Sequence, residues 1–85
     1  MDIVVGDLLT VGGHKYMTLE VLSYENKKYA FVNRVINEDE ITKEYYIVED
    51  LGGSVKTVMD DDLRNILLPK FEKMLMSDLN SLDEE

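Results

Sequence analysis

The sequence predicts an α+β protein: an antiparallel sheet of four or five strands, either a meander or a small open barrel, followed by one kinked C-terminal helix. Apolar and polar residues alternate along several short segments of the first 59 residues, with tight turns between them. From residue 60 onward, apolar residues recur at helical spacing. A length of 85 residues leaves room for one domain. We expect a single compact domain over residues 1–79 and a frayed acidic tail over residues 80–85.

The predicted strands are rich in β-branched and aromatic residues, which favour a half-buried pleated surface. Gly12-Gly13 supplies a turn that tolerates positive φ, and Glu25-Asn26-Lys27 supplies a second turn. Leu51-Gly52-Gly53-Ser54 supplies a third. Strands joined by turns this short pair antiparallel. The expected strands are residues 8–11, 16–24, 28–35, 44–50 and 55–59.

Strict alternation decides which side chains share a face of the sheet. In the second strand it places Leu19 and Val21 on one face and Leu22 on the other. In the fourth strand Tyr45 and Tyr46 are adjacent, so they must face opposite ways and at least one is partly exposed.

The helix is expected to begin near Asp60, whose side chain suits an N-cap. Asp61 and Asp62 follow in the first turn, where negative charge complements the helix dipole. Pro69 lies too deep to be a first-turn proline. It should either kink the helix or begin a second short helix.

Two apolar stripes run along this helix and together span about 200°, more than the ~100° needed to cover one sheet face. Either Pro69 re-aims the second half so that both stripes meet the same core, or the second stripe is an exposed patch for a homodimer or another partner. The first stripe holds Leu63, Ile66, Leu67, Phe71 and Met74, and the second holds Leu68, Leu75, Leu79 and Leu82.

The formal net charge of −9 repels phosphate backbones, so we expect no direct binding to nucleic acid. Residues 1–59 hold ten acids and six bases, a balance of −4; residues 60–85 hold eight and three, a balance of −5. The last third of the chain therefore carries more than half of the excess negative charge. A basic protein is the partner that this charge favours, although solubility alone would also explain it.

The chain has no cysteine, no signal-peptide pattern at its start and no long apolar run. We therefore expect a soluble cytoplasmic protein that does not bind a membrane.

Catalytic and metal-binding side chains are scarce, so no enzyme, metal or cofactor is expected. Adjacent carboxylates at residues 60–62 can hold Mg²⁺ or Ca²⁺, but they lack the spacing of a calcium loop, and helix capping explains them. His14 is the single histidine, beside Gly12-Gly13 in a predicted turn, with no local nucleophile to activate, and we expect it to be an exposed turn residue. The two Gly-Gly pairs lie between strands, so neither opens a helix as a phosphate loop would.

Several segments together resemble a known group of proteins. They are GDLLT at 6–10, GGHKYMTLEVLSYENKKYAFV at 12–32, EYYIVED at 44–50 and a closing acidic helix with a Leu-Leu-Pro break at 67–69. This pattern resembles the small acidic proteins of unknown function found in Gram-positive bacteria and their phages. The resemblance implies a compact sheet-plus-helix fold, carries over no functional residue, and adds a context in which small acidic proteins bind and block host proteins.

The function predicted from these observations is non-enzymatic protein binding. The chain would be a phage- or prophage-type inhibitor (anti-defence, anti-CRISPR-like or DNA-mimic) of a basic, nucleic-acid-handling protein. The alternative is a structural module that homodimerises through Leu68, Leu75, Leu79 and Leu82 of its helix. The residues expected to contact a partner are Glu38, Asp39, Glu40, Glu49, Asp50, Asp60, Asp61 and Asp62.

Overall fold

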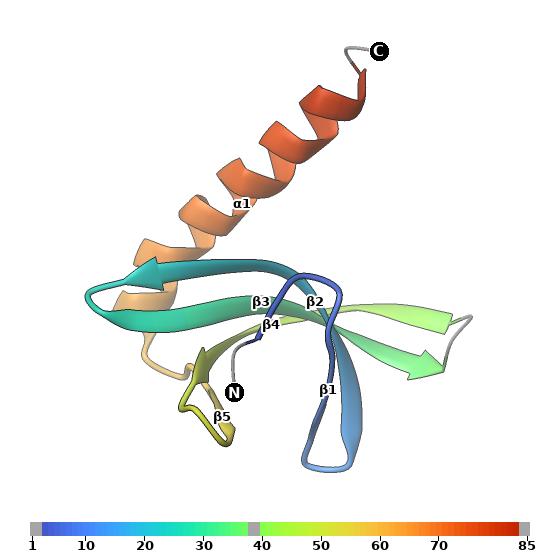
Figure 1. The fold of residues 1–85 in the computed structure, drawn as a ribbon, viewed down its shortest axis with the longest axis vertical. Helices are drawn as coiled ribbons and strands as arrows, with labels where there is room; N and C mark the ends of the chain where they lie inside the picture. The colour runs from blue at the N-terminus through green and yellow to red at the C-terminus, as the bar shows by residue number, and fades with distance from the viewer. Residues whose placement is uncertain (1–2, 38–39, 84–85) are drawn as a thin grey trace.

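In the part of the chain that the structure describes, five antiparallel strands form one open sheet in chain order, and a single C-terminal helix packs on one face of it (Figure 1). The structure is a computed structural model that describes the backbone of residues 3–37 and 40–83, and the side chains of these residues except 41 and 78–83. The predicted α+β meander is confirmed, with β1 and β5 as the two edges of the sheet. The elements are β1 (Leu8–Val11), β2 (His14–Tyr24), β3 (Lys27–Asn37), β4 (Glu40–Asp50), β5 (Val55–Thr57) and α1 (Asp61–Asp83).

Two-residue turns fix the register of the first two hairpins. Glu25 and Asn26 both have positive φ, 50° and 67°, as do the two glycines between β1 and β2. Two successive positive φ angles are the geometry whose twist matches that of the flanking strands. The second turn therefore pairs Tyr24 with Lys27 and sets the register of the long β2–β3 hairpin.

A bulge at Leu19 makes the predicted alternation of β2 wrong. Thr18 and Glu20 pair with successive residues of β3, so Leu19 is an extra residue. An inserted residue shifts the phase of all side chains that follow it. Leu19 and Leu22 consequently pack on the helix side of the sheet, and Val21 packs on the opposite side.

The central strand β3 separates two apolar cores, and its middle residues are buried on both faces. The core on the helix side, here called the helix-side core, is larger than the core on the other face. Its buried residues are Tyr29, Phe31, Ile47, Val58, Leu67 and Phe71. The core on the other face is made by Ile3, Ala30, Val32 and Val48, with Leu9, Tyr16, Val21 and Val55 packed against it.

The strand β4 begins at Glu40, four residues earlier than predicted. Its first part pairs irregularly with β3, and the buried side chain of Asn33 supplies hydrogen bonds there in place of backbone pairing. The Asn33 amide donates to the carbonyl oxygens of Thr42 (2.7 Å) and Glu44 (3.2 Å). These bonds satisfy carbonyl groups that the register shifts would otherwise leave without a partner.

The N-cap predicted for the helix is confirmed. Asp60 Oδ1 accepts hydrogen bonds from the backbone N–H groups of Asp62 (2.9 Å) and Leu63 (3.4 Å). The expected kink is not seen, because α1 continues through Pro69 as one helix and no second helix begins there. Pro69 and Asn65 are both exposed, so water can reach the Asn65 carbonyl that lacks a donor at Pro69.

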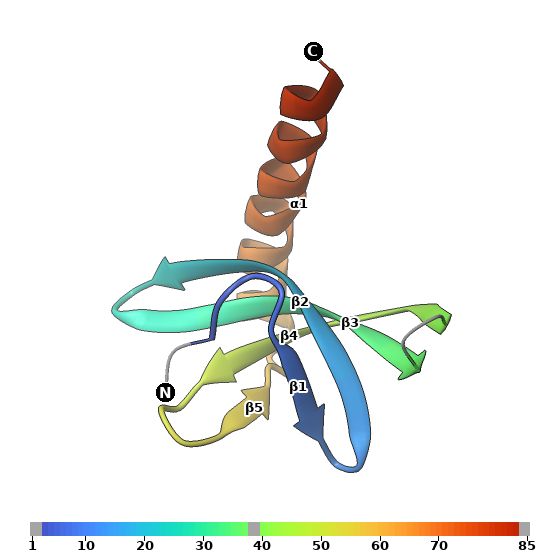
Figure 2. The same ribbon diagram turned by 45° about the vertical axis from the view of Figure 1, so that its right-hand side comes forward.

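The first half of α1 packs on the sheet, and its second half extends beyond it (Figures 1 and 2). Leu67 and Phe71 are 0% exposed, and the Phe71 ring stacks on Phe31 with centroids 5.5 Å apart. Ile66, assigned by spacing to the same stripe, is 42% exposed. The buried face of α1 is therefore narrower than the apolar surface that it carries.

Candidate functional site

Of the acidic residues predicted to contact a partner, those that the structure describes lie in two groups at opposite ends of β4. Glu40 begins the strand and is exposed, while Glu38 and Asp39 lie outside the described residues. Glu49 and Asp50 end the same strand. The nine residue steps from Glu40 to Glu49 span about 30 Å along a strand. The acidic residues are thus not gathered in a single patch.

The carboxylate of Asp50 is used within the chain. Its Oδ1 accepts the N–H of Gly52 (2.9 Å), and its Oδ2 accepts the N–H of Ile3 (3.2 Å). The Gly52 hydrogen bond, then that of Ile3 and the charge of Lys28, hold the pKa of Asp50 below its ordinary value against the opposing effect of burial. Asp50 joins the β4–β5 turn to the N-terminal segment.

Glu49 and Asp60 meet at a surface hollow of about 190 Å³ between the end of β4, β5 and the start of α1. Lys56, Met59 and Leu63 also line this space, which we call the acidic hollow. Glu49 is half-buried, whereas the Asp60 carboxylate also caps the helix.

Asp61 and Asp62 add exposed charge beside this hollow. The Asp61 side chain is 90% exposed, and its Oδ1 lies 3.8 Å from Arg64 Nη1 across one helical turn. A long, exposed pair of this kind contributes little free energy. The negative charge at the start of α1 is therefore available to a partner.

A larger, mostly apolar groove lies between β4 and α1, and the sequence reasoning did not predict it. It has a volume of about 420 Å³. Tyr45 forms part of its wall and stacks on Phe31, with ring centroids 5.5 Å apart and planes 3° apart. Arg64, Leu68 and Glu72 line it from α1, and Met59, 76% exposed, lines it as well. We call this the β4–α1 groove.

The β4–α1 groove and the acidic hollow adjoin, since Thr57, Val58 and Met59 line both. One continuous surface therefore runs from an aromatic, apolar groove to a group of carboxylates.

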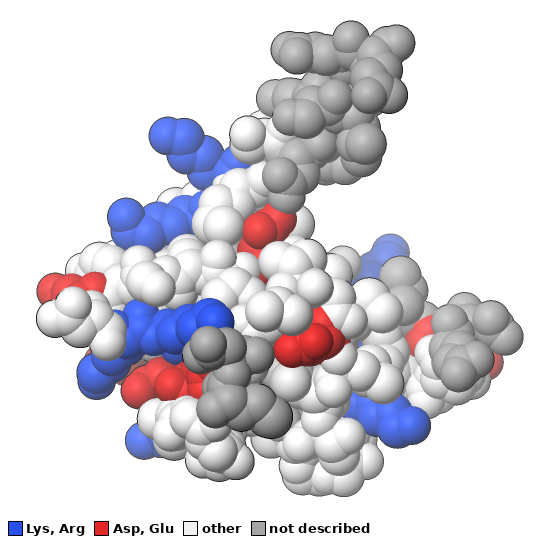
Figure 3. All heavy atoms as spheres, viewed as in Figure 1, with Lys and Arg blue, Asp and Glu red and all other residues white. Residues whose placement is uncertain are grey.

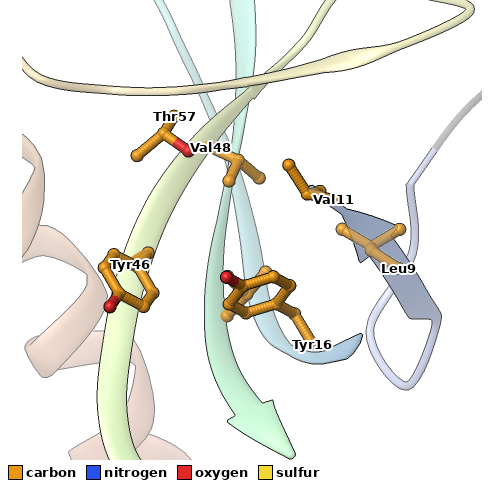
Figure 4. Close-up of a pocket in the computed structure, with 7 residues that line it drawn as sticks. Leu9, Val11, Tyr16, Tyr46, Val48 and Thr57 are labelled. Carbon is orange, nitrogen blue, oxygen red and sulfur yellow. The ribbon is translucent and has the colours of Figure 1, made fainter. Parts of the chain in front are cut away.

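On the face opposite α1, the curled sheet encloses a second apolar space of about 160 Å³, the concave hollow (Figure 4). Side chains from all five strands line it, including Leu9 of β1 and Thr57 of β5. Tyr16 lies between Leu9 and Tyr46, and its ring meets that of Tyr46 edge-on at 5.7 Å. Tyr45 and Tyr46 thus face opposite ways, 48% and 38% exposed, as the alternation predicted.

His14 is exposed, as expected, but it is the first residue of β2 rather than a turn residue. Its Nδ1 lies 3.2 Å from Arg34 Nη2, and Arg34 Nη1 donates to Glu44 Oε2 at 2.9 Å. A guanidinium donates and does not accept, so Nδ1 is the acceptor here and a neutral His14 carries its proton on Nε2. These three side chains join β2, β3 and β4 at one end of the sheet.

The four leucines predicted for self-association differ in their surroundings. Leu68 is 39% exposed and lines the β4–α1 groove. Leu75 is half-buried and packs against the helix-side core. Leu79 and Leu82 lie on α1, but their side chains fall outside the described residues.

Charge is unevenly distributed on the face shown in Figure 3. Lysine and arginine gather around the lower part of α1 and the adjacent sheet, while acidic residues are scattered between broad uncharged areas. Among the described residues, this face carries no continuous acidic surface.

Comparison with known proteins finds no match: no family model, no curated protein and no solved structure matches this chain. The resemblance to small acidic phage and bacterial proteins therefore stays a prediction. Within the described residues, no three potential ligand side chains come together as a metal site. No helix in this part of the chain combines the length and apolar character needed to cross a bilayer.

Proposed function

We propose that this chain is a non-enzymatic protein-binding protein that docks on a basic partner through the β4–α1 groove and the adjoining acidic hollow. One observation carries the proposal: an apolar groove of about 420 Å³ continues past Met59 into a hollow walled by Glu49 and Asp60. Exposed aromatic and methionine side chains in a concave surface are typical anchors of protein interfaces.

The net charge of −9 and the exposed carboxylates at the start of α1 support a basic partner. Complementary charges steer two proteins together and raise the rate of association, while the apolar groove supplies affinity after contact. Asp61, whose side chain is 90% exposed, is accessible for such an encounter.

The kind of partner that we propose is a nucleic-acid-handling protein, since such proteins carry basic surfaces. The chain would then be an inhibitor of phage or prophage type: anti-defence, anti-CRISPR-like or DNA-mimic. The acidic composition and the resemblance stated above support this version. It would act in the cytoplasm, where such a target works.

A charge reversal at Asp61 tests the proposal. With a partner captured from bacterial lysate and then purified, Asp61→Lys should weaken binding about tenfold at low salt, and wild-type binding should weaken steeply as salt rises. Glu25→Lys is the matched control, because it changes the net charge equally at an exposed turn that lines neither the groove nor the hollow. Salt-insensitive binding, or equal losses in the two variants, would contradict the proposal.

The alternative function, homodimerisation through α1, is supported by the second half of the helix, which extends beyond the sheet and carries Met76 at 63% exposure. Sedimentation equilibrium should then show a wild-type dimer that Leu79→Glu and Leu68→Glu each convert to a monomer. Lys73→Gln, which makes the net charge more negative by the same amount at an exposed position on the opposite side of the helix from these leucines, should leave the dimer intact. A wild-type monomer at all concentrations would exclude this alternative.

A further inference from the structure

The strand β4 has a long open edge. It pairs with β3 along most of its length, but β5 contains only Val55–Thr57 and pairs with β4 over Val48, Glu49 and Asp50. From residue 40 to residue 46, no strand of the described residues lies on the outer side of β4.

One hydrogen bond shows which residues of β4 direct their backbone N–H and C=O groups outward along this edge. The N–H of Val58 donates to the carbonyl of Ile47 at 2.8 Å, so Ile47 directs its backbone groups away from β3. Backbone direction alternates along a strand. Tyr45 therefore presents its N–H and C=O groups on the outer side. The register shift next to Asn33 interrupts simple alternation, but the carbonyls of Thr42 and Glu44 both accept from the Asn33 amide of β3. Lys43 between them therefore also faces outward, where a further strand would pair.

Apolar space lies on both sides of this edge. Tyr45, Tyr46 and Ile47 all line the β4–α1 groove, although their side chains alternate between the faces, so the groove reaches the edge of β4 itself. The concave hollow on the opposite face shares Tyr46 and Thr57 with that groove. A strand added here would thus place alternate side chains in the groove and in the concave hollow.

The two acidic groups stand at the two ends of the open edge. Glu40 is at one end, and Glu49 and Asp60 lie beyond the other end, where β5 pairs with β4. Between them Lys43 and Glu44 are adjacent residues of opposite charge. The charge pattern complements a segment that is apolar in the middle and basic at both ends. A second copy of this chain fits poorly, because antiparallel pairing centred on Lys43 or Glu44 sets like charges opposite each other and joins two chains of net charge −9.

We propose that the open edge of β4 binds an extended segment of the basic partner as a sixth strand of the sheet. This inference rests on the proposed function and specifies how the partner is held. Backbone pairing at Lys43 and Tyr45 gives affinity, and the two apolar spaces select bulky side chains at successive positions of the segment. A helical ligand in the same groove would instead show anchors three and four residues apart.

A matched pair of variants at Lys43 tests this mode of binding. Lys43→Pro removes the outward N–H but no hydrogen bond to β3, a change that edge strands tolerate, whereas Lys43→Ala removes the same charge and keeps the N–H. The probe is a labelled synthetic peptide, Lys-Lys-Val-Tyr-Val-Ile-Thr-Lys-Lys, followed by fluorescence anisotropy. We expect binding to Lys43→Pro about tenfold weaker than to Lys43→Ala, with circular dichroism showing both variants folded.

A second peptide, methylated on alternate amide nitrogens along its pairing edge, should also lose binding, whereas methylation on the other edge should not. Equal affinity of the two Lys43 variants, insensitivity to both methylation patterns, or no binding at millimolar peptide would overturn strand addition.

Binding measurements with the purified partner distinguish strand addition from the proposed function. If Asp61→Lys weakens binding to the partner but the two Lys43 variants bind it equally, the proposed function stands and strand addition is rejected. If neither the Asp61→Lys substitution nor added salt weakens binding to the partner, the proposed function itself is rejected.

Discussion

Replacing Phe71 with alanine is expected to lower the free energy of unfolding by about 3–5 kcal/mol. The Phe71 side chain is 0% exposed and stacks on Phe31 at 5.5 Å, where it joins α1 to the sheet. The loss combines the transfer free energy of the ring with the cavity that it leaves. A domain of this size has a total stability of roughly 5–15 kcal/mol, so much of it would disappear. Urea unfolding followed by circular dichroism measures the change.

Ile66→Ala is the control for Phe71→Ala, because it truncates a large side chain on the same helix that is 42% exposed. Its effect should stay below about 1 kcal/mol, since exposed positions lose little on truncation and alanine favours the helix. Equal losses in the two variants would show that α1 does not depend on the Phe31–Phe71 contact.

Replacing Asp50 with alanine is expected to cost about 2–3 kcal/mol at neutral pH, because an ionised carboxylate loses two backbone hydrogen bonds. The pKa of Asp50 is lowered in the folded state, chiefly by the Gly52 N–H and then by the Ile3 N–H and Lys28. A lowered pKa means that this stabilisation is complete above the unfolded pKa, near 3.8, and is lost as pH falls through the folded value.

Urea unfolding of wild type and Asp50→Ala at pH 7 and at several values below pH 4 checks this dependence. The stability difference between the two proteins should shrink as the acidity rises. Asp61→Ala, at a carboxylate that is 90% exposed, should show a smaller stability difference from wild type at pH 7. A gap between wild type and Asp50→Ala that is constant with pH would mean that the charge of Asp50 does not stabilise the fold.

Local sequence signals predicted the elements whose cause is local. The Glu25-Asn26 turn and the Asp60 cap depend on residues within a few positions, and both are present. The bulge at Leu19 was missed because an extra residue leaves no mark in a simple apolar pattern and is decided by pairing with β3. The early start of β4 was missed for a related reason, since Asn33 supports it from another strand.

Less of the candidate site than of the fold could be predicted from the sequence. Charge and composition indicated a basic partner, and they singled out Glu49 and Asp60, which the structure brings to one hollow. The β4–α1 groove depends on where β5 ends and on how α1 crosses the sheet. Both are tertiary features that no local pattern encodes. Exposed Tyr45 and Met59, apolar residues outside the cores, were the signals that could have suggested it.

The chain-order arrangement of the sheet also bears on how the molecule folds. Every strand pairs with its sequence neighbour, so contact order is low and the sheet should assemble quickly through local hairpins. The helix and the N-terminal segment are exceptions, because Phe71 must reach Phe31, and Ile3 must reach Asp50, over long stretches of chain. During synthesis on the ribosome the five strands emerge before α1, so the apolar surface around Phe31 is the last to be covered. Until α1 docks, that surface and the open edge of β4 are exposed together, and this interval is when the nascent chain is most prone to aggregation.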